Sequence, residues 1–275
     1  MLNIGCHLSA SEGFLNMAKT AQSIGANTFQ FFLRNPHSAK DIKFSDQDIE
    51  NFKIFAQKNN FSKIIAHSPY TMNLCSAKPG VRKFSAQILK DDLIKMNKIP
   101  GNFYNLHPGS HTGLGIKKGI ELISETLGNI LSQNNFNNII ILEMMSGKGS
   151  EIGSTFDEIS NIIRESGAGK NLGVCFDTCH MFDAGFDFNN LEKILDEFDK
   201  KIGIEKLKAV HLNDSKNLLG SKKDRHEKIG QGFFGLEVFR KILNNNYIKN
   251  LPMILETPND LPGYAEEILI LKSLV

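Results

Sequence analysis

Ionisable side chains stand at the ends of short apolar segments along the whole of this 275-residue chain. Eight such segments of four to six residues recur, and seven of them end in an ionisable residue: His7, His67, His107, Glu143, Asp177, His211 and Glu256. Burying an unpaired carboxylate costs free energy, whereas a bound cation removes that cost. Imidazoles and carboxylates that meet at one place are typical ligands of zinc or another divalent transition metal. Any one of these residues alone would more often be structural, but their joint placement predicts a metal centre.

Three more candidate ligands lie in the loops that follow two of these segments. His180 comes three residues after Asp177. Asp224 and His226 are two residues apart, so in an extended segment both side chains would face the same way. This spacing suits two ligands of one metal. For this pair taken alone, a solvated loop with unrelated charges is an equal alternative.

The loop that contains Asp224 and His226 is also basic. Apart from the nearby Asp214, five positive side chains oppose two negative ones within thirteen residues: Lys216, Lys222, Lys223, Arg225 and Lys228 against Asp224 and Glu227. The resulting charge of +3 suits contact with phosphate beside the metals, and a solvated basic loop is the alternative.

Residues 230–235 read Gly-Gln-Gly-Phe-Phe-Gly, which satisfies the dinucleotide-binding pattern G-x-G-x-x-G. That pattern binds a nucleotide only when it follows a full buried strand in a βαβ unit, and here it follows Glu-Lys-Ile. We therefore expect these glycines to serve a tight turn, and we expect no nucleotide cofactor.

The apolar segments must be strands that carry the candidate ligands at their carboxyl ends. Runs without polar alternation suit strands buried on both faces, as in a parallel sheet. The segments start 24 to 45 residues apart, and helical spacing fills the gaps, for example at 84–94, 116–131 and 156–163. Eight βα units in about 250 residues are the pattern of a (β/α)8 TIM barrel, whose active site lies at the C-terminal ends of the strands. An open doubly wound sheet is the competing architecture, but it would usually need fewer strands or a second domain. No Pro-rich or Ser-rich linker divides the chain, so we expect an α/β fold with a single domain over 1–275.

Composition excludes several classes of protein. The net charge of +2 is too small for a polycation that coats nucleic acid. The longest apolar runs have four residues, whereas a membrane span needs about 20. The start lacks the basic and apolar build of a secretory signal, and four cysteines without a Cys-x-x-Cys pair suit buried thiols. We therefore expect a cytoplasmic protein with no membrane contact.

Three long motifs resemble the signatures of the endonuclease IV family of apurinic/apyrimidinic endonucleases. They are VCFDTCHMFDAGFD at 174–187, HLNDSKNLLGSKKDRHEKIGQG at 211–232 and LETPND at 255–260, and shorter matches lie at 5–13, 66–70 and 106–111. The resemblance implies a TIM barrel with three Zn2+ ions that cuts double-stranded DNA on the 5′ side of abasic sites. We also expect removal of 3′ blocking groups, action as a monomer, and catalysis centred on Glu143 and Glu256.

The same resemblance divides the candidate ligands among three metals. His67, His107 and Glu143 would hold the first zinc, and Glu143 would bridge to the second. Asp177, His211 and Glu256 would complete the second site. The third zinc would take the remaining three ligands: His180, Asp224 and His226.

The sequence also departs from the family pattern. Met144 stands where asparagine is usual after the bridging glutamate, so a polar group that supports a metal ligand could be missing. In the loop after the second strand, His37 and Ala39 replace an arginine and a large aromatic residue. That loop and the loop of Tyr70 insert into DNA in the family. The resemblance implies DNA contacts by Arg34, Tyr70, Lys222 and Arg225.

Two other functions remain open on the sequence. A divalent-metal sugar isomerase or epimerase on a related barrel would also carry carboxylates and histidines at its mouth, but it needs neither a third metal nor a basic loop. A non-catalytic lesion-binding protein would keep the metals for structure alone.

Overall fold

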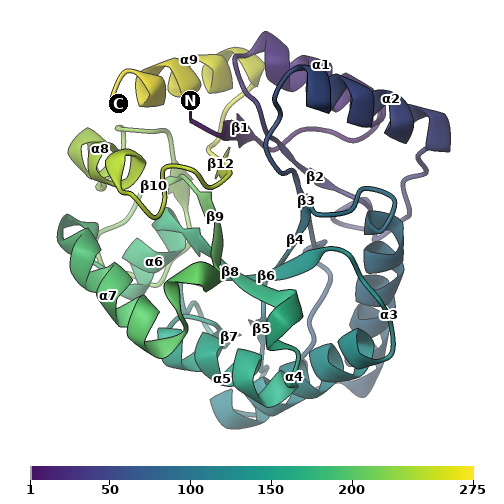
Figure 1. Ribbon diagram of the computed structural model, residues 1–275. Helices are drawn as coiled ribbons and strands as arrows, with labels where there is room; N and C mark the ends of the chain where they lie inside the picture. The colour runs from purple at the N-terminus through teal and green to yellow at the C-terminus, as the bar shows by residue number, and fades with distance from the viewer. Residues whose placement is uncertain (1) are drawn as a thin grey trace.

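Eight parallel strands form a barrel in the computed structural model, which describes residues 2–275 (Figure 1). The strands are β1 (Ile4–Cys6), β2 (Gln30–Phe32), β3 (Ile65–His67), β4 (Phe103–Leu106), β6 (Ile139–Glu143), β8 (Leu172–Asp177), β9 (Leu207–His211) and β12 (Met253–Leu255). Their order in the sheet is β1-β12-β9-β8-β6-β4-β3-β2. Each coincides with one of the eight apolar segments, so the expected TIM barrel is confirmed.

The barrel closes where β1 meets β2. His7 forms a parallel bridge with Gln30, and the backbone N–H of Leu8 donates to the carbonyl of Gln30 at 2.8 Å. Elsewhere the neighbouring strands pair over two to four residues in register, except that the pairing of β8 with β9 shifts register between Val174 and Cys175. The seam between β1 and β2 therefore has few backbone contacts, and it lies beside His7.

Helices surround the barrel as a ring (Figure 1). They are α1 (Phe14–Ser23), α2 (Asp46–Lys58), α3 (Pro79–Met96), α4 (Ile116–Ser132), α5 (Phe156–Ser166), α6 (Thr178–Ala184), α7 (Leu191–Lys201), α8 (Leu236–Asn244) and α9 (Leu261–Lys272). The hydroxyls of Ser45 and Thr155 accept hydrogen bonds from the third following backbone N–H and begin α2 and α5. Two short antiparallel pairs extend the loops: β5 (Gly109–Ser110) with β7 (Glu151–Ile152), and β10 (Asp214–Ser215) with β11 (His226–Glu227).

The barrel interior is filled by apolar side chains. They form a cluster distinct from the larger core between barrel and helices: Ile65, Phe103, Ile141, Cys175, Ala209 and Ile254. These side chains form an apolar floor below the polar groups at the carboxyl ends of the strands. All four cysteines are buried and unpaired, as the sequence predicted. Over residues 2–275, no helix is both long enough and apolar enough to cross a membrane.

Candidate metal centre

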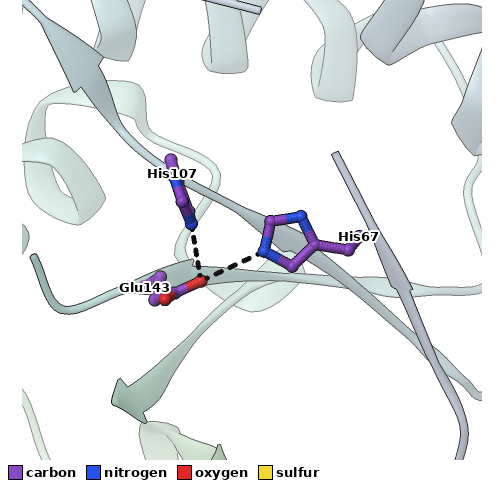
Figure 2. A group of neighbouring side chains, drawn as sticks. All are labelled: His67, His107 and Glu143. Carbon is purple, nitrogen blue, oxygen red and sulfur yellow. Dashed lines mark ion pairs between the residues drawn. The ribbon is translucent and has the colours of Figure 1, made fainter. Parts of the chain in front are cut away.

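The carboxyl ends of the barrel strands bring the nine predicted ligands into three neighbouring groups. In the first, Figure 2 shows His67 and His107 pointing at one oxygen of Glu143. The Nε2 atoms lie 3.4 Å and 3.1 Å from Oε2 of Glu143. Ligand atoms of a tetrahedral zinc site with bonds of 2.0–2.1 Å are about 3.4 Å apart. The spacing of this group therefore fits one metal ion.

The second group is built around His211 at the end of β9. Its Nδ1 lies 3.1 Å from Oε2 of Glu256, 3.5 Å from Oε1 of Glu143 and 3.7 Å from Oδ2 of Asp177. Glu143 thus offers Oε2 to the first group and Oε1 to the second. A carboxylate that faces two groups in this way is suited to bridge two metals.

The third group joins α6 to the long loop after β9. Nε2 of His180 lies 3.1 Å from Oδ1 of Asp224, and Nε2 of His226 lies 3.8 Å from the same oxygen. His226 is also 3.8 Å from Oδ2 of Asp177, so the third group adjoins the second. Cys179 comes close to Asp177 and His226 as well, but burial raises the pKa of its thiol and keeps it protonated.

The expected reason for the pairing of Asp224 with His226 was wrong. The segment is not extended at Asp224, whose φ is +57°, in the left-handed region. The side chains converge because buried Asp183 folds the loop. Its carboxylate accepts the backbone N–H groups of Lys223 and Asp224 at 3.3 Å and 2.8 Å, and its carbonyl accepts that of Lys222.

Several candidate ligand atoms are buried without a hydrogen-bond partner among residues 2–275. Nε2 of His211 is one of them, and the three that face a group are Oε1 of Glu143, Nδ1 of His211 and Nε2 of His226. A buried polar atom left unsatisfied costs about 1–3 kcal/mol. Each of these three atoms faces its group, so a cation would satisfy all of them. The residues present therefore fit a set of bound metal ions.

Backbone carbonyls orient three of the imidazoles. Nδ1 of His67 contacts the backbone carbonyl of Ser68 at 2.7 Å. Nδ1 of His180 contacts the carbonyl of Met144 at 3.2 Å, and Nδ1 of His226 contacts the carbonyl of Glu256 at 3.1 Å. A carbonyl oxygen only accepts, so the proton lies on Nδ1 and the Nε2 lone pair faces the metal group. Met144 supplies its contact through the backbone, and its side chain is buried. The substitution at Met144 therefore leaves the orientation of His180 intact.

Three buried amides that the sequence analysis missed hold the carboxylates. Asn105 donates to Oε2 of Glu143, Asn213 donates to Oδ2 of Asp177 at 2.7 Å, and Gln30 donates to Oε1 of Glu256 at 2.5 Å. All three amides have no exposed surface. Their signal in the sequence was a polar residue within or just after an apolar strand. At Glu256 this leaves Oε2 free to face His211, whereas at Glu143 and Asp177 the amide donates to an oxygen that also faces histidines.

Electrostatics keep the central carboxylates ionised. Burial alone would raise the pKa of Glu143, but the charges of His107 and His211 hold it well below its usual range. Burial is likewise outweighed at Glu256, where His211 lowers the pKa. His7, which faces the same mouth, has its pKa lowered by burial. The carboxylates therefore offer metal-binding lone pairs at neutral pH.

The four expected DNA contacts differ in their surroundings. The Arg34 side chain is only 11% exposed, and its Nε lies 2.6 Å from Oδ1 of Asp92. Asp92 of α3 thus pairs with the Arg34 guanidinium, and the expected contact of Arg34 with DNA stays a prediction. Lys222 and Arg225 are exposed, and Tyr70 is 61% exposed beside the metal groups.

Tyr70 belongs to an aromatic cluster at the mouth. Its ring lies 5.5 Å from that of Phe32, 6.1 Å from that of His37 and 6.3 Å from that of His67, between centroids. Partial burial and the nearby carboxylates raise the pKa of Tyr70 to about 12. His37 is exposed at the loop tip, whereas Ala39 is buried with φ +54°.

The glycines at 230–235 form a turn around Asp214, as predicted. The Asp214 carboxylate accepts the backbone N–H groups of Gly230, Gly232 and Phe234 at 2.9, 3.2 and 2.9 Å. A Cβ atom at Gly232 would lie 2.3 Å from the carbonyl oxygen of Ser215. Only glycine fits this approach. Asp214 thus anchors the end of the loop that carries Asp224 and His226, a role that the sequence analysis missed.

Comparison with known proteins identifies a TIM-barrel family and close relatives of this chain. The family model described as a xylose isomerase-like TIM barrel matches residues 18–274. A probable endonuclease 4 from Clostridium beijerinckii is 53% identical over 100% of this chain and 99% of its own length. The probable endonuclease 4 of Akkermansia muciniphila is 50% identical over 98% of this chain and 97% of its own length.

Solved structures agree. The crystal structure of endonuclease IV from Thermus thermophilus has a TM-score of 0.86 and 27% identity, and covers 99% of this chain and 98% of that one. The 3-keto-D-glucoside 4-epimerase from E. coli has a TM-score of 0.69 and 13% identity, and covers 99% of this chain and 100% of that one. That second likeness shows the fold alone.

Proposed function

The chain belongs to the endonuclease IV family, and on this premise we propose that it is a DNA-repair endonuclease that acts at abasic sites. It hydrolyses the phosphodiester bond on the 5′ side of the abasic nucleotide, which leaves a 3′-hydroxyl and a 5′-deoxyribose phosphate. Removal of 3′ blocking groups would use the same bond cleavage. The observation that carries the proposal is the convergence of nine imidazole and carboxylate residues on three groups around Glu143.

We propose that the three groups hold three zinc ions. His67, His107 and Glu143 would hold the first, Glu143, Asp177, His211 and Glu256 the second, and His180, Asp224 and His226 the third. Zinc, when bound, supplies activation of a water molecule near neutral pH and neutralisation of developing phosphate charge. Four carboxylates against three divalent ions leave a net charge of +2, which attracts a phosphodiester.

The protein's own residues would perform the positioning. Glu143 belongs to both of the first two groups, so it would fix the distance between the two metal sites nearest to the reacting phosphate. Asn105 and Asn213 hold the ligand carboxylates in one orientation, since each donates to a carboxylate oxygen. The apolar floor below them keeps bulk water out of the barrel side of the site.

Selection of the abasic nucleotide would depend on shape. A nucleotide without a base has lost its stacking, so its extrusion costs less than that of an intact one. The exposed ring of Tyr70 is placed to fill the vacated space, and Lys222 and Arg225 to contact phosphates of the bent duplex. We propose action as a monomer, in the cytoplasm, where chromosomal DNA would be the substrate.

The decisive experiment incubates the protein with a duplex that contains one tetrahydrofuran abasic analogue, with and without chelator. We expect one cut, 5′ to the analogue, that chelator abolishes and added zinc restores, and no cut in the matched intact duplex. Tight binding without scission in the zinc-loaded protein would instead favour a lesion-binding protein. Turnover of a ketose or aldose with no scission would favour the isomerase or epimerase alternative.

A further inference from the structure

His7 is the one strand-end histidine of the mouth that belongs to none of the three metal groups over residues 2–275. It follows β1 at the seam where the barrel closes onto Gln30 of β2. Its ring packs against the ring of Phe32 with centroids 4.4 Å apart. Its Nδ1 lies 3.1 Å from Nε2 of Gln30, so the ring is fixed on two sides.

The neighbours of Gln30 determine which nitrogen of His7 carries the proton. Nε2 of Gln30 lies 2.5 Å from Oε1 of Glu256, and an ionised carboxylate only accepts hydrogen bonds. The atom next to Glu256 must therefore be the amide nitrogen, and its second hydrogen points to Nδ1 of His7. Nδ1 then accepts, so a neutral His7 bears its proton on Nε2.

The Nε2–H of His7 has no partner within the part of the chain that the structure describes. The side-chain hydrogen bond of His7 involves Nδ1, and its side chain is 20% exposed. His7 also lines two hollows at the mouth. One, of about 440 Å³, lies between the loops after β1 and β12, and the other, of about 510 Å³, lies between the loops after β1 and β2. His7 is thus an oriented donor at an open surface beside the metal groups.

We propose that His7 is a further catalytic residue, whose Nε2–H donates a hydrogen bond to a backbone oxygen of the DNA strand bound over the metal centre. This inference rests on the proposed function. The chain from His7 through Gln30 to Glu256 ties the donor to a metal ligand, so the bound DNA strand is held at a fixed distance from the metals. No proton is transferred, since His7 acts as a neutral donor.

Two substitutions of similar size separate this role from simple support of Gln30. The amide nitrogen of His7→Gln can take the place of Nε2, whereas the shorter amide of His7→Asn can replace only Nδ1. We expect His7→Gln to keep kcat/KM for the abasic duplex within about threefold of the unmodified enzyme. We expect His7→Asn to lose about 10- to 100-fold, the range for one hydrogen bond to a charged group. Both variants should keep their metal content.

Other outcomes would overturn the inference. The reverse ranking would show that His7 only supports Gln30, and unchanged activity in both variants would show that it has no role. Loss of metal from both would make it a support of the metal site. Both variants could also lose activity equally while they retain their metals. In that case, DNA strands in which a single phosphate is replaced by a neutral methylphosphonate test whether His7 contacts the backbone. At one position the replacement should lower kcat/KM of the unmodified enzyme more than that of His7→Asn. Equal effects on the two proteins at every position would refute the contact. Failure of the unmodified enzyme to cut would instead refute the proposed function.

Discussion

Nε2 of His180 lies 3.1 Å from Oδ1 of Asp224, although the two residues are 44 positions apart in the chain. His180 is fixed on α6, but Asp224 lies in a long loop with a left-handed backbone. The contact therefore depends on what holds the loop. Asp183, one turn further along α6 than His180, accepts the backbone N–H of Asp224.

Replacement of Asp183 should weaken the third metal group without touching a ligand. In Asp183→Ala the loop loses its anchor, and we expect the affinity for one of the three proposed metals to fall about 10- to 100-fold, as for other groups that orient ligands. Competition with a chromogenic chelator measures this loss. Asp187→Ala, which removes the half-buried N-cap of the following turn, Phe188–Asn190, is the control. Unchanged affinity for all metals in Asp183→Ala would contradict the role of this anchor.

Glu143→Gln tests the bridge between the first two groups. An amide has one acceptor oxygen, so it cannot offer one oxygen to the first group, beside His107, and another to the second group, beside His211, as the carboxylate does. We expect cleavage to fall by at least about 10³-fold, as for loss of a central electrostatic group. Metal content should drop, and circular dichroism should stay unchanged. Near-normal cleavage by this variant would refute the bridging role.

Much of this site was predictable because parallel strands share one direction. Once the eight apolar segments are strands of a barrel, residues such as His67, Glu143 and His211 must meet at the same rim. The division of the ligands into three groups was not predictable from spacing. It depends on side-chain directions that only the assembled barrel fixes.

What could not be predicted involves contacts that are distant in sequence. Arg34 is expected to contact DNA, but its position in the sequence does not indicate that its guanidinium pairs with Asp92, 58 residues later. The turn at Asp224 depends on Asp183, 41 residues earlier. The amide of Asn105 looks like an isolated polar residue in a strand until Glu143 on the neighbouring strand is placed beside it.

Asn213→Asp should lower activity by changing a single donor. Asn213 donates to Oδ2 of Asp177 at 2.7 Å, and its side-chain oxygen accepts the backbone N–H of Glu256 at 2.9 Å. Aspartate keeps the acceptor but replaces the donor by a second negative charge against Asp177. We expect kcat/KM to fall by about 10- to 100-fold. Asn213→Ser, which retains a donor without adding charge, should lose less, and equal losses would show that charge is not the cause.

Arg34 and Arg225 should differ in what their removal affects. Arg34→Ala removes the closest cation of buried Asp92 and leaves it the Tyr104 hydroxyl and the more distant Lys95, so we expect a loss of about 3 kcal/mol in the free energy of unfolding. Arg225→Ala should change the free energy of unfolding by less than about 0.5 kcal/mol. It should weaken DNA binding and lower the salt dependence of the binding constant by the equivalent of about one phosphate contact. Urea unfolding and binding titrations over a salt series measure both effects. A salt slope that changes in Arg34→Ala and not in Arg225→Ala would reverse this assignment.

Removal of bound metal should destabilise the whole barrel. Without cations, buried atoms such as Oε1 of Glu143 and Nε2 of His226 have no hydrogen-bond partner among the described residues. Because these atoms belong to segments that meet at the mouth of the barrel, the cost of leaving them unpaired falls on the whole barrel. A ligand that binds only the folded state stabilises it by about 4 kcal/mol at a thousandfold excess over its Kd. We therefore expect chelation to lower the unfolding midpoint in calorimetry and to abolish cleavage, and zinc to restore both. Glu143→Gln, which should already lack metals, should respond less to chelator than the unmodified protein. An equal shift in the two proteins would mean that chelator acts elsewhere than at these groups.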